Sequence, residues 1–158
     1  MGAMTPTWNA AARGTFFGFS LSHSREHLVR ATMEASAYGL RDITDRFRSM
    51  GVEPQEIRAV GGGARSPLWR QIKADVTGLP VAALSTVETT ALGAALLALD
   101  GAGLVNSLEE AVDANVQVVE RRDPDPRAVA RYEEYYQLYR ELYFALEPVF
   151  TKAAQIPA

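Results

Sequence analysis

The stretch "VGGGARSPLWRQIKADVTG", Val60–Gly78, joins a short apolar run to a helix-like pattern through three consecutive glycines. The run before it, Ile57–Gly61, has the composition of a short buried strand. Ser66 followed by Pro67 is typical of an N-cap with proline at the first helical position, and Gly78 is typical of a helix end. The stretch therefore predicts strand, glycine corner and helix in succession, which is characteristic of an α/β layer.

The sequence on either side extends this pattern. Before the corner, Ser24 is a candidate N-cap for a helix that ends near Gly51, and residues 5–21 form an irregular lead-in. In this helix a mostly apolar set of residues recurs at spacings of three and four, which predicts one buried face: Val29, Met33, Ser36, Leu40, Ile43 and Phe47. The helix after the corner has a similar predicted inner face: Leu68, Trp69, Ile72 and Val76.

After the corner, residues 79–84 predict a second strand and residues 88–103 a helix rich in small side chains. Residues 107–110 carry a capping-box pattern that opens a short helix, and residues 115–120 alternate like a strand. Asp125-Pro126 begins a long final helix whose tyrosines, Tyr132 to Tyr143, we expect to pack in the core. Strands separated by helices favour parallel pairing, but two or three strands are too few for a complete sheet. Either the pattern fails to reveal further strands, or the chain is part of a larger domain.

The overall composition of the chain excludes several classes of function. The chain has 158 residues, a net charge of −3 and 22% charged residues, so we expect no affinity for nucleic acid or for a membrane surface. It contains no cysteine, which excludes disulfides and thiolate metal sites and fits a cytoplasmic protein. No apolar run is long enough to span a bilayer. Residues 1–4, "MGAM", are set aside as a start or cloning remnant.

The glycine corner has two interpretations. Glycines let a ligand approach the main chain closely, and the following helix start favours an anion, so a nucleotide is one candidate occupant. Alternatively the glycines serve only a tight turn. Two sharper nucleotide motifs are excluded, because a dinucleotide-binding fingerprint needs glycine where Ser66 stands and no Gly-Lys-Ser/Thr triplet occurs in the chain.

Three blocks in order carry a resemblance. They are "ARGTFFGFSLSHSREHLVRATMEASAYGLRD", "GGGARSPLWRQIKADVTGLPV" and "ETTALGAALLA". Together they resemble the C-terminal domain of the FGGY family of carbohydrate kinases, and within it the xylulokinases. The resemblance implies an incomplete actin-like, ribonuclease-H-like ATPase domain of α/β class. Residues 5–158 would form its nucleotide-side portion, without the first strands of the domain.

The resemblance also implies an activity and a site. FGGY kinases transfer the γ-phosphoryl group of ATP to a sugar hydroxyl with Mg²⁺, and xylulokinases convert D-xylulose to xylulose 5-phosphate. By resemblance, Gly62, Gly63 and Ala64 lie against the adenosine, and Arg65 and Ser66 border its ribose or adenine. The catalytic aspartate belongs to the family's N-terminal half, so this chain is assigned no catalytic residue and no metal ligand. The expected partners are that missing half and the sugar, and we expect the chain alone to be inactive.

Other interpretations stay open. A second candidate function is a non-catalytic interaction or oligomerisation module derived from a kinase domain, and an uncovered apolar surface predicts a homo-oligomer. His23 and His27 match a zinc-peptidase pattern, but Ser24 as N-cap places His23 outside the helix, which argues against a metal site. Asp42 and Asp45 are expected on a solvated, ion-paired helix face.

Overall fold

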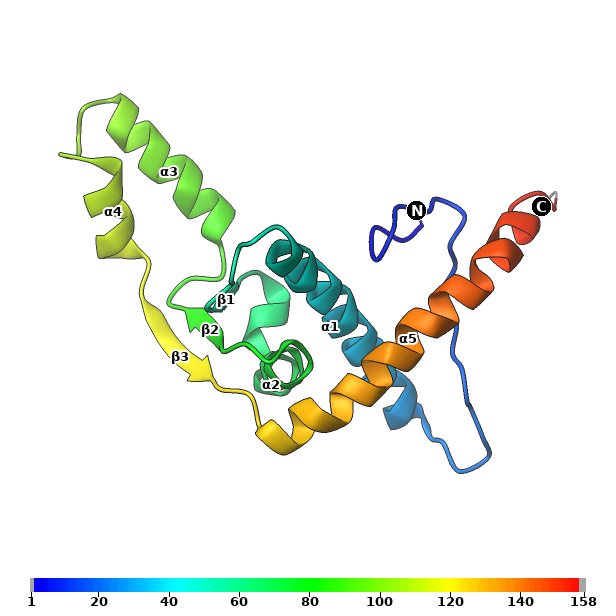
Figure 1. The fold of residues 1–158 in the computed structure, drawn as a ribbon. Coiled ribbons are helices and arrows are strands. Elements are labelled where there is room, and N and C mark those ends of the chain that lie inside the picture. Colours follow the sequence, from blue (N-terminus) through cyan, green and yellow to red (C-terminus); the bar gives the residue numbers. More distant parts are fainter. Residues whose placement is uncertain (1, 157–158) are drawn as a thin grey trace.

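The computed structural model describes residues 2–156 of the chain, and Figure 1 shows their arrangement. A small sheet has the strand order β1-β2-β3, with β1 parallel to β2 and β3 antiparallel to β2. The parallel pair confirms the predicted α/β class. The elements in chain order are α1 (Arg25–Ser49), β1 (Ile57–Ala59), a short 3-10 helix (Gly62–Arg65), α2 (Pro67–Thr77), β2 (Val81–Leu84), α3 (Thr89–Gly101), α4 (Leu108–Asn115), β3 (Val118–Arg122) and α5 (Pro126–Ala153).

Local chemistry explains the helix boundaries. The Ser66 hydroxyl accepts a hydrogen bond from the backbone N–H of Trp69, and Pro67 occupies the first position of α2. Gly78 ends α2 in the left-handed region, with φ at 69°. Asp125 caps α5 by accepting from the backbone N–H of Arg127. These ends agree with the sequence-based expectations, because each depends only on neighbouring residues.

The main core lies between α1, α2 and α5. Tyr38 of α1 packs with Ile72 and Val76 of α2 and with Tyr132 and Tyr136 of α5. Tyr132 and Tyr136 of the predicted tyrosine row are therefore confirmed as core residues, whereas Tyr135 is 47% exposed. Burial raises the pKa of the Tyr38 and Tyr136 hydroxyls above their usual value, so both stay neutral.

The buried face of α1 differs from the predicted one. Val29, Ile43 and Phe47 of the expected apolar stripe are 56%, 44% and 45% exposed, whereas Asp42 is buried. The Asp42 Oδ1 atom accepts a hydrogen bond of 2.7 Å from the Tyr136 hydroxyl, so the expectation of a solvated Asp42 was wrong. Val29, Ile43 and Phe47 thus lack cover among the described residues, whereas Met33 of the same stripe packs against the core.

The inner face of α2 was predicted only in part. Ile72 and Val76 are fully buried and Trp69 is half-buried, but Leu68 is 53% exposed. The structure buries Arg70 and Asp75 of α2 instead. Both are tied to groups on other elements, which offsets the cost of removing their charges from water.

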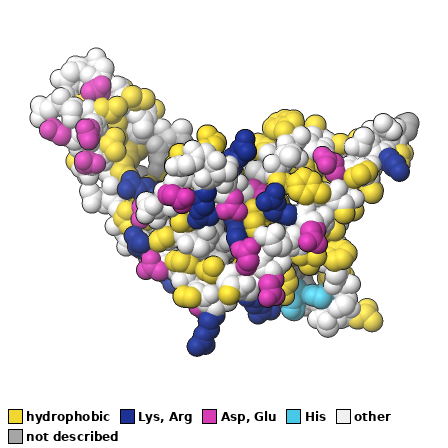
Figure 2. Space-filling view, viewed as in Figure 1, with side chains coloured by type: hydrophobic (Ala, Val, Ile, Leu, Met, Phe, Trp, Pro, Cys, Tyr) yellow, Lys and Arg dark blue, Asp and Glu magenta, His cyan; other side chains and the backbone are white. Residues whose placement is uncertain are grey.

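Helices α3 and α4 form an arm that extends from the sheet (Figure 1). Helix α3 contains a single buried residue, Leu96, although its sequence is apolar over nearly its whole length. Leu97 is 62% exposed, and apolar side chains are visible on the arm in the space-filling view (Figure 2). An all-round apolar helix normally lies inside a protein, so this arm is unusual for its composition.

The N-terminal lead-in packs against the last helix. The Tyr143 hydroxyl donates to the carbonyl of Thr7 at 3.1 Å, and Ala12 clusters with Tyr143 and Phe150. Ala3, in the segment that sequence reasoning set aside, pairs with Asn9 through two backbone hydrogen bonds. In the described part of the chain, every helix is too short or too polar to cross a membrane.

Candidate functional site

The glycine corner begins where β1 ends, at the carboxyl edge of the parallel strands. Gly61 has φ 70° and ψ −169°, a conformation that is essentially restricted to glycine. The chain then makes a single 3-10 turn, in which the Ala64 N–H donates to the Gly61 carbonyl at 3.0 Å. The Gly61 N–H donates to the Val87 carbonyl at 3.1 Å, which ties the corner to the segment before α3. The corner is thus an ordered turn whose path requires Gly61.

The three glycines of the corner differ in the free space beside their Cα atoms. An added Cβ atom at Gly61 or Gly62 would meet nothing within 4 Å. An added Cβ atom at Gly63 would lie 3.0 Å from the Trp69 ring, so the indole backs the main chain there. One side of the corner therefore offers bare main chain to the surroundings, and the other is supported by an aromatic ring.

Trp69 is itself held in place. Its ring N–H donates to the Met33 carbonyl at 3.2 Å and to the Ser36 hydroxyl at 2.9 Å, both on α1. The Lys73 ammonium lies 4.5 Å from the centre of the ring, and burial lowers the pKa of this group. Trp69 thus connects the corner with the middle of α1.

The remaining predicted site residues occupy different environments. Ala64 is buried, whereas the Arg65 side chain is 69% exposed and its guanidinium lies 3.8 Å from the Glu88 carboxylate. Ser66 is half-buried, and its hydroxyl is engaged as the N-cap of α2. Glu88 precedes α3 but makes no side-chain capping bond. The structure therefore brings the predicted residues together at one turn, with Arg65 and Glu88 at its exposed rim.

Sequence reasoning missed two residues at this turn. Arg70 of α2 is buried, and its guanidinium donates to the Ala64 carbonyl and pairs with Glu120 of β3. An arginine in the first turn of a helix usually lies at the surface, and Glu120 is 50 positions away. Nothing in the local sequence indicates that these two groups meet behind the corner.

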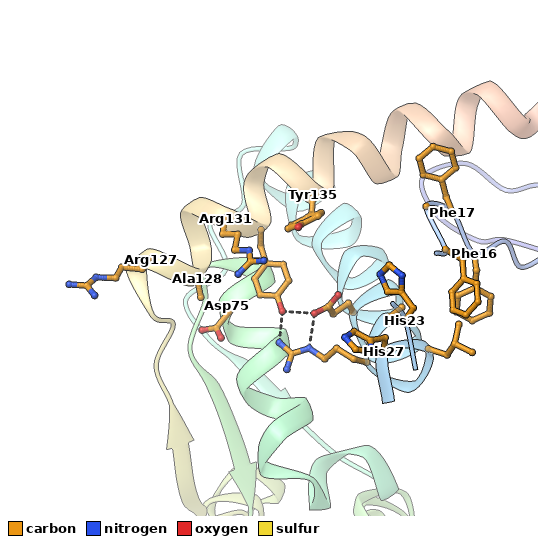
Figure 3. A pocket seen from close by; sticks show the side chains of 16 residues that line it. Phe16, Phe17, His23, His27, Asp75, Arg127, Ala128, Arg131 and Tyr135 are labelled. Carbon is orange, nitrogen blue, oxygen red and sulfur yellow. Dashed lines mark hydrogen bonds and ion pairs between the residues drawn. The ribbon is translucent and has the colours of Figure 1, made fainter. Parts of the chain in front are cut away.

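A separate hollow of about 710 Å³ lies between the lead-in, the start of α1 and the start of α5 (Figure 3). Dashed lines in Figure 3 mark a network in which Glu34 accepts from both Arg30 and Tyr132, and Arg30 donates to the Tyr132 hydroxyl. Burial works against the charge of Arg30, but its bonds to Tyr132 and Glu34 raise its pKa. None of the corner residues lines this hollow.

The two histidines of the hollow act in turns and caps. The Nδ1 atoms of His23 and His27 accept from the backbone N–H groups of Ser20 and Ser24, each at 3.1 Å. Within residues 2–156, no group of three or more His, Cys, Asp or Glu side chains is placed to hold a metal ion. The histidine pattern is therefore explained by local backbone structure.

Residues 1–101 match the family described as "FGGY family of carbohydrate kinases, C-terminal domain". The chain belongs to this family. Its fold accordingly matches FGGY kinases of known structure. For example, it superposes on a ligand-bound xylulose kinase from Lactobacillus acidophilus with a TM-score of 0.82 and 29% sequence identity, over 94% of this chain and 30% of that one.

Curated relatives include several sugar and polyol kinases. A xylulose kinase from Staphylococcus epidermidis is 35% identical over 90% of this FGGY chain, and a glycerol kinase from Streptococcus agalactiae is 38% identical over 72% of it. The chain spans about three tenths of the xylulose kinase, 29% of its length, and 23% of the glycerol kinase. The family is thus established, whereas the relatives differ in the acceptor that their names state.

Proposed function

We propose that this chain supplies the adenosine-binding part of an ATP-dependent sugar kinase. The observation that carries the proposal is the bare main chain at Gly61 and Gly62, which lies at the carboxyl edge of two parallel strands and has open space beside it. The base or ribose of ATP would lie against this corner, with Gly62, Gly63 and Ala64 beneath it. Arg65 and Ser66 would border the ribose or adenine.

The proposed reaction is transfer of the γ-phosphoryl group of ATP to a sugar hydroxyl. D-Xylulose is the proposed acceptor, with xylulose 5-phosphate as product, because xylulose kinases are prominent among the similar proteins. Phosphoryl transfer depends on positioning and charge neutralisation, and Mg²⁺ would supply part of that neutralisation in the complete enzyme. Mg²⁺ in such enzymes is bound by one or two carboxylates together with the phosphates of the nucleotide.

The proposed partner is the remainder of the kinase. Three features support it: β1 lies at the edge of the sheet, the apolar stripe of α1 is exposed, and α3 buries only Leu96. Further segments of the kinase would pair with β1 and cover these apolar side chains. Because the base for the sugar hydroxyl would come from this partner, we expect no turnover by the chain alone. A coupled assay of ATP consumption with xylulose tests this, and enzyme-like turnover by the purified chain would contradict it.

A second candidate function is an interaction or oligomerisation module. The aromatic lead-in supports it, because Phe16, Phe17 and Phe19 are 58%, 67% and 60% exposed. Such a module would form a homo-oligomer without binding nucleotide. Light scattering at micromolar concentration tests the association, and a constant monomeric mass would count against it.

Calorimetric titration with ATP separates the two functions. We expect weak, saturable binding to a single site, abolished in Gly62→Trp, since a Cβ atom at Gly62 meets nothing within 4 Å and the added ring would occupy the space proposed for the nucleotide. Gly101→Trp is the matched control, because it also places an indole in open space but lies at the far end of α3. Heat release that is absent at millimolar ATP, or unchanged in Gly62→Trp, would reject the adenosine assignment.

A further inference from the structure

Arg70 is a buried cation directly behind the glycine corner. Its side chain is 4% exposed, and one nitrogen of its guanidinium donates to the carbonyl of Ala64 in the 3-10 turn. A second nitrogen pairs with the Glu120 carboxylate on β3. Glu120 also pairs with Arg122 of the same strand, which limits the freedom of its carboxylate. One side chain thus joins the corner to the antiparallel strand of the sheet.

A buried arginine is costly unless its donors are satisfied. The Nε atom of Arg70 is buried and finds no hydrogen-bond partner among the described residues. An apolar residue of similar length would fill the same volume without this cost. Packing therefore does not explain why an arginine stands at this position. Its planar guanidinium explains it, because this group can bind a carbonyl and a carboxylate at the same time.

The corner has few other tethers. Gly61, Gly62 and Gly63 have no side chains, and the 3-10 turn is held by single backbone bonds at Gly61 and Ala64, by the Ala64 methyl group, which packs against Ala59, Ala74 and Val81, and by the Trp69 ring behind Gly63. A three-glycine segment has many accessible conformations, and fixing it in one costs conformational entropy. The Arg70 bond to the Ala64 carbonyl acts on the residue that follows the three glycines and restricts the turn from behind, away from the open face at Gly62.

We propose that Arg70, oriented by Glu120, is a positioning residue that holds the glycine corner in the shape that adenosine requires. This inference rests on the proposed function for its ligand. It assigns Arg70 no contact with the nucleotide: the guanidinium acts through the Ala64 carbonyl. A rigid corner binds better than a mobile one, because the cost of ordering it is met during folding rather than on binding.

The chain offers a closely matched control. Arg41 of α1 is also nearly buried, donates to a backbone carbonyl (that of Val76, at 3.3 Å) and pairs with a glutamate, Glu133. Its Nε atom is likewise buried without a hydrogen-bond partner among the described residues, although it lies 3.7 Å from the Asp45 carboxylate. Arg41 lies away from the corner, so Arg41→Met removes the same kinds of interaction without touching the turn.

The experiment compares Arg70→Met, Arg70→Lys and Glu120→Gln with Arg41→Met. Exchange of the Ala64 amide hydrogen, measured by NMR in the ligand-free chain, reports the 3-10 turn directly. ATP affinity is measured on the same proteins by calorimetry. We expect faster exchange and an affinity loss of at least about tenfold in Arg70→Met, as is typical when a residue that orients a binding group is removed. Arg70→Lys should fail to restore either property, since it keeps the charge but lacks the fork.

The outcomes separate the two proposals. Faster Ala64 exchange in Arg70→Met but not in Arg41→Met supports the tether, even if the wild-type chain binds no ATP, in which case only the adenosine assignment fails. Unchanged exchange in Arg70→Met overturns the tether, whatever happens to ATP. Should Arg70→Met fail to fold, Glu120→Gln removes the charge partner while keeping the shape, and unaltered exchange and affinity in that variant would equally overturn it.

Discussion

Helices α2 and α3 have similar lengths and each follows a parallel strand of the sheet, but their environments are opposite. Helix α2 carries Arg70, Lys73 and Asp75 and nevertheless buries most of its second half. Helix α3 is apolar up to Asp100 and buries only Leu96. Composition alone would assign these two environments the other way round. The difference shows that burial depends on which elements are present to pack against, and that α3 has the composition of a helix whose cover lies outside the described residues.

The largest expected contrast is between one apolar side chain from each helix. Ile72 of α2 is 1% exposed, so we expect Ile72→Ala to lower the free energy of unfolding by about 2–5 kcal/mol. Leu97 of α3 is 62% exposed, and Leu97→Ala should change it by less than about 0.5 kcal/mol. Urea denaturation followed by circular dichroism measures both. Equal losses would mean that the arm is packed in solution and would break the comparison.

A smaller effect tests the polar part of the core that α2 shares with α1 and α5. Tyr136→Phe removes the hydroxyl that donates to Asp42 and leaves a buried carboxylate oxygen without its donor. We expect a loss of about 1–3 kcal/mol in the same denaturation experiment. Tyr135→Phe is the control, since Tyr135 is 47% exposed and its hydroxyl should contribute less than about 0.5 kcal/mol. A neutral Tyr136→Phe variant would show that this hydroxyl does not stabilise the core.

The smallest expected effect concerns the pH dependence of the same pair. Burial raises the pKa of the Asp42 carboxyl above its usual value, although its bond from Tyr136 and the nearby Arg140 act in the opposite direction. The native state therefore binds this proton at a higher pH than the unfolded chain does. Its contribution to stability is present below the unfolded pKa and is lost as the pH rises through the folded pKa.

Asp42→Asn removes this titration. The stability of the variant relative to the wild type should therefore increase between about pH 3 and about pH 7, measured by urea denaturation at each pH. Asp100→Asn, at an exposed aspartate of α3, is the control for the substitution itself and is measured in parallel at each pH. A difference between Asp42→Asn and the wild type that is independent of pH would exclude Asp42 as the titrating group.

The sequence predicts where helices begin and end better than it predicts which face of a helix is buried. Caps and breakers at Ser66, Pro67 and Gly78 are local signals, and the helix they bound is present as expected. The buried face of α1 was predicted from apolar spacing and proved to be centred on Ala37, Tyr38 and Asp42. Spacing cannot show which of two amphipathic faces finds a partner, because that depends on elements distant in the chain.

The candidate site shows the same limit. The glycines and the cap at Ser66 could be found from the sequence, since their chemistry is contained within a few residues. The buried arginine behind them could not, because an arginine is normally solvated and its partner Glu120 comes from a strand that pairs antiparallel with β2. Groups whose chemistry lies within a few neighbouring residues are thus easier to predict than groups that meet only in the tertiary fold.

The packing of the lead-in along α5 has a practical consequence. Ala3 and Ala12 cluster with Tyr143 and Phe150, so segments near the two ends of the described chain pack together. The turn between α3 and α4 lies at the other extreme, and its residues are largely exposed. A short linker between the present ends, with a new opening in that turn, would give a circularly permuted protein with an unaltered core. Fluorophores attached at the new ends would then report whether a partner binds the arm.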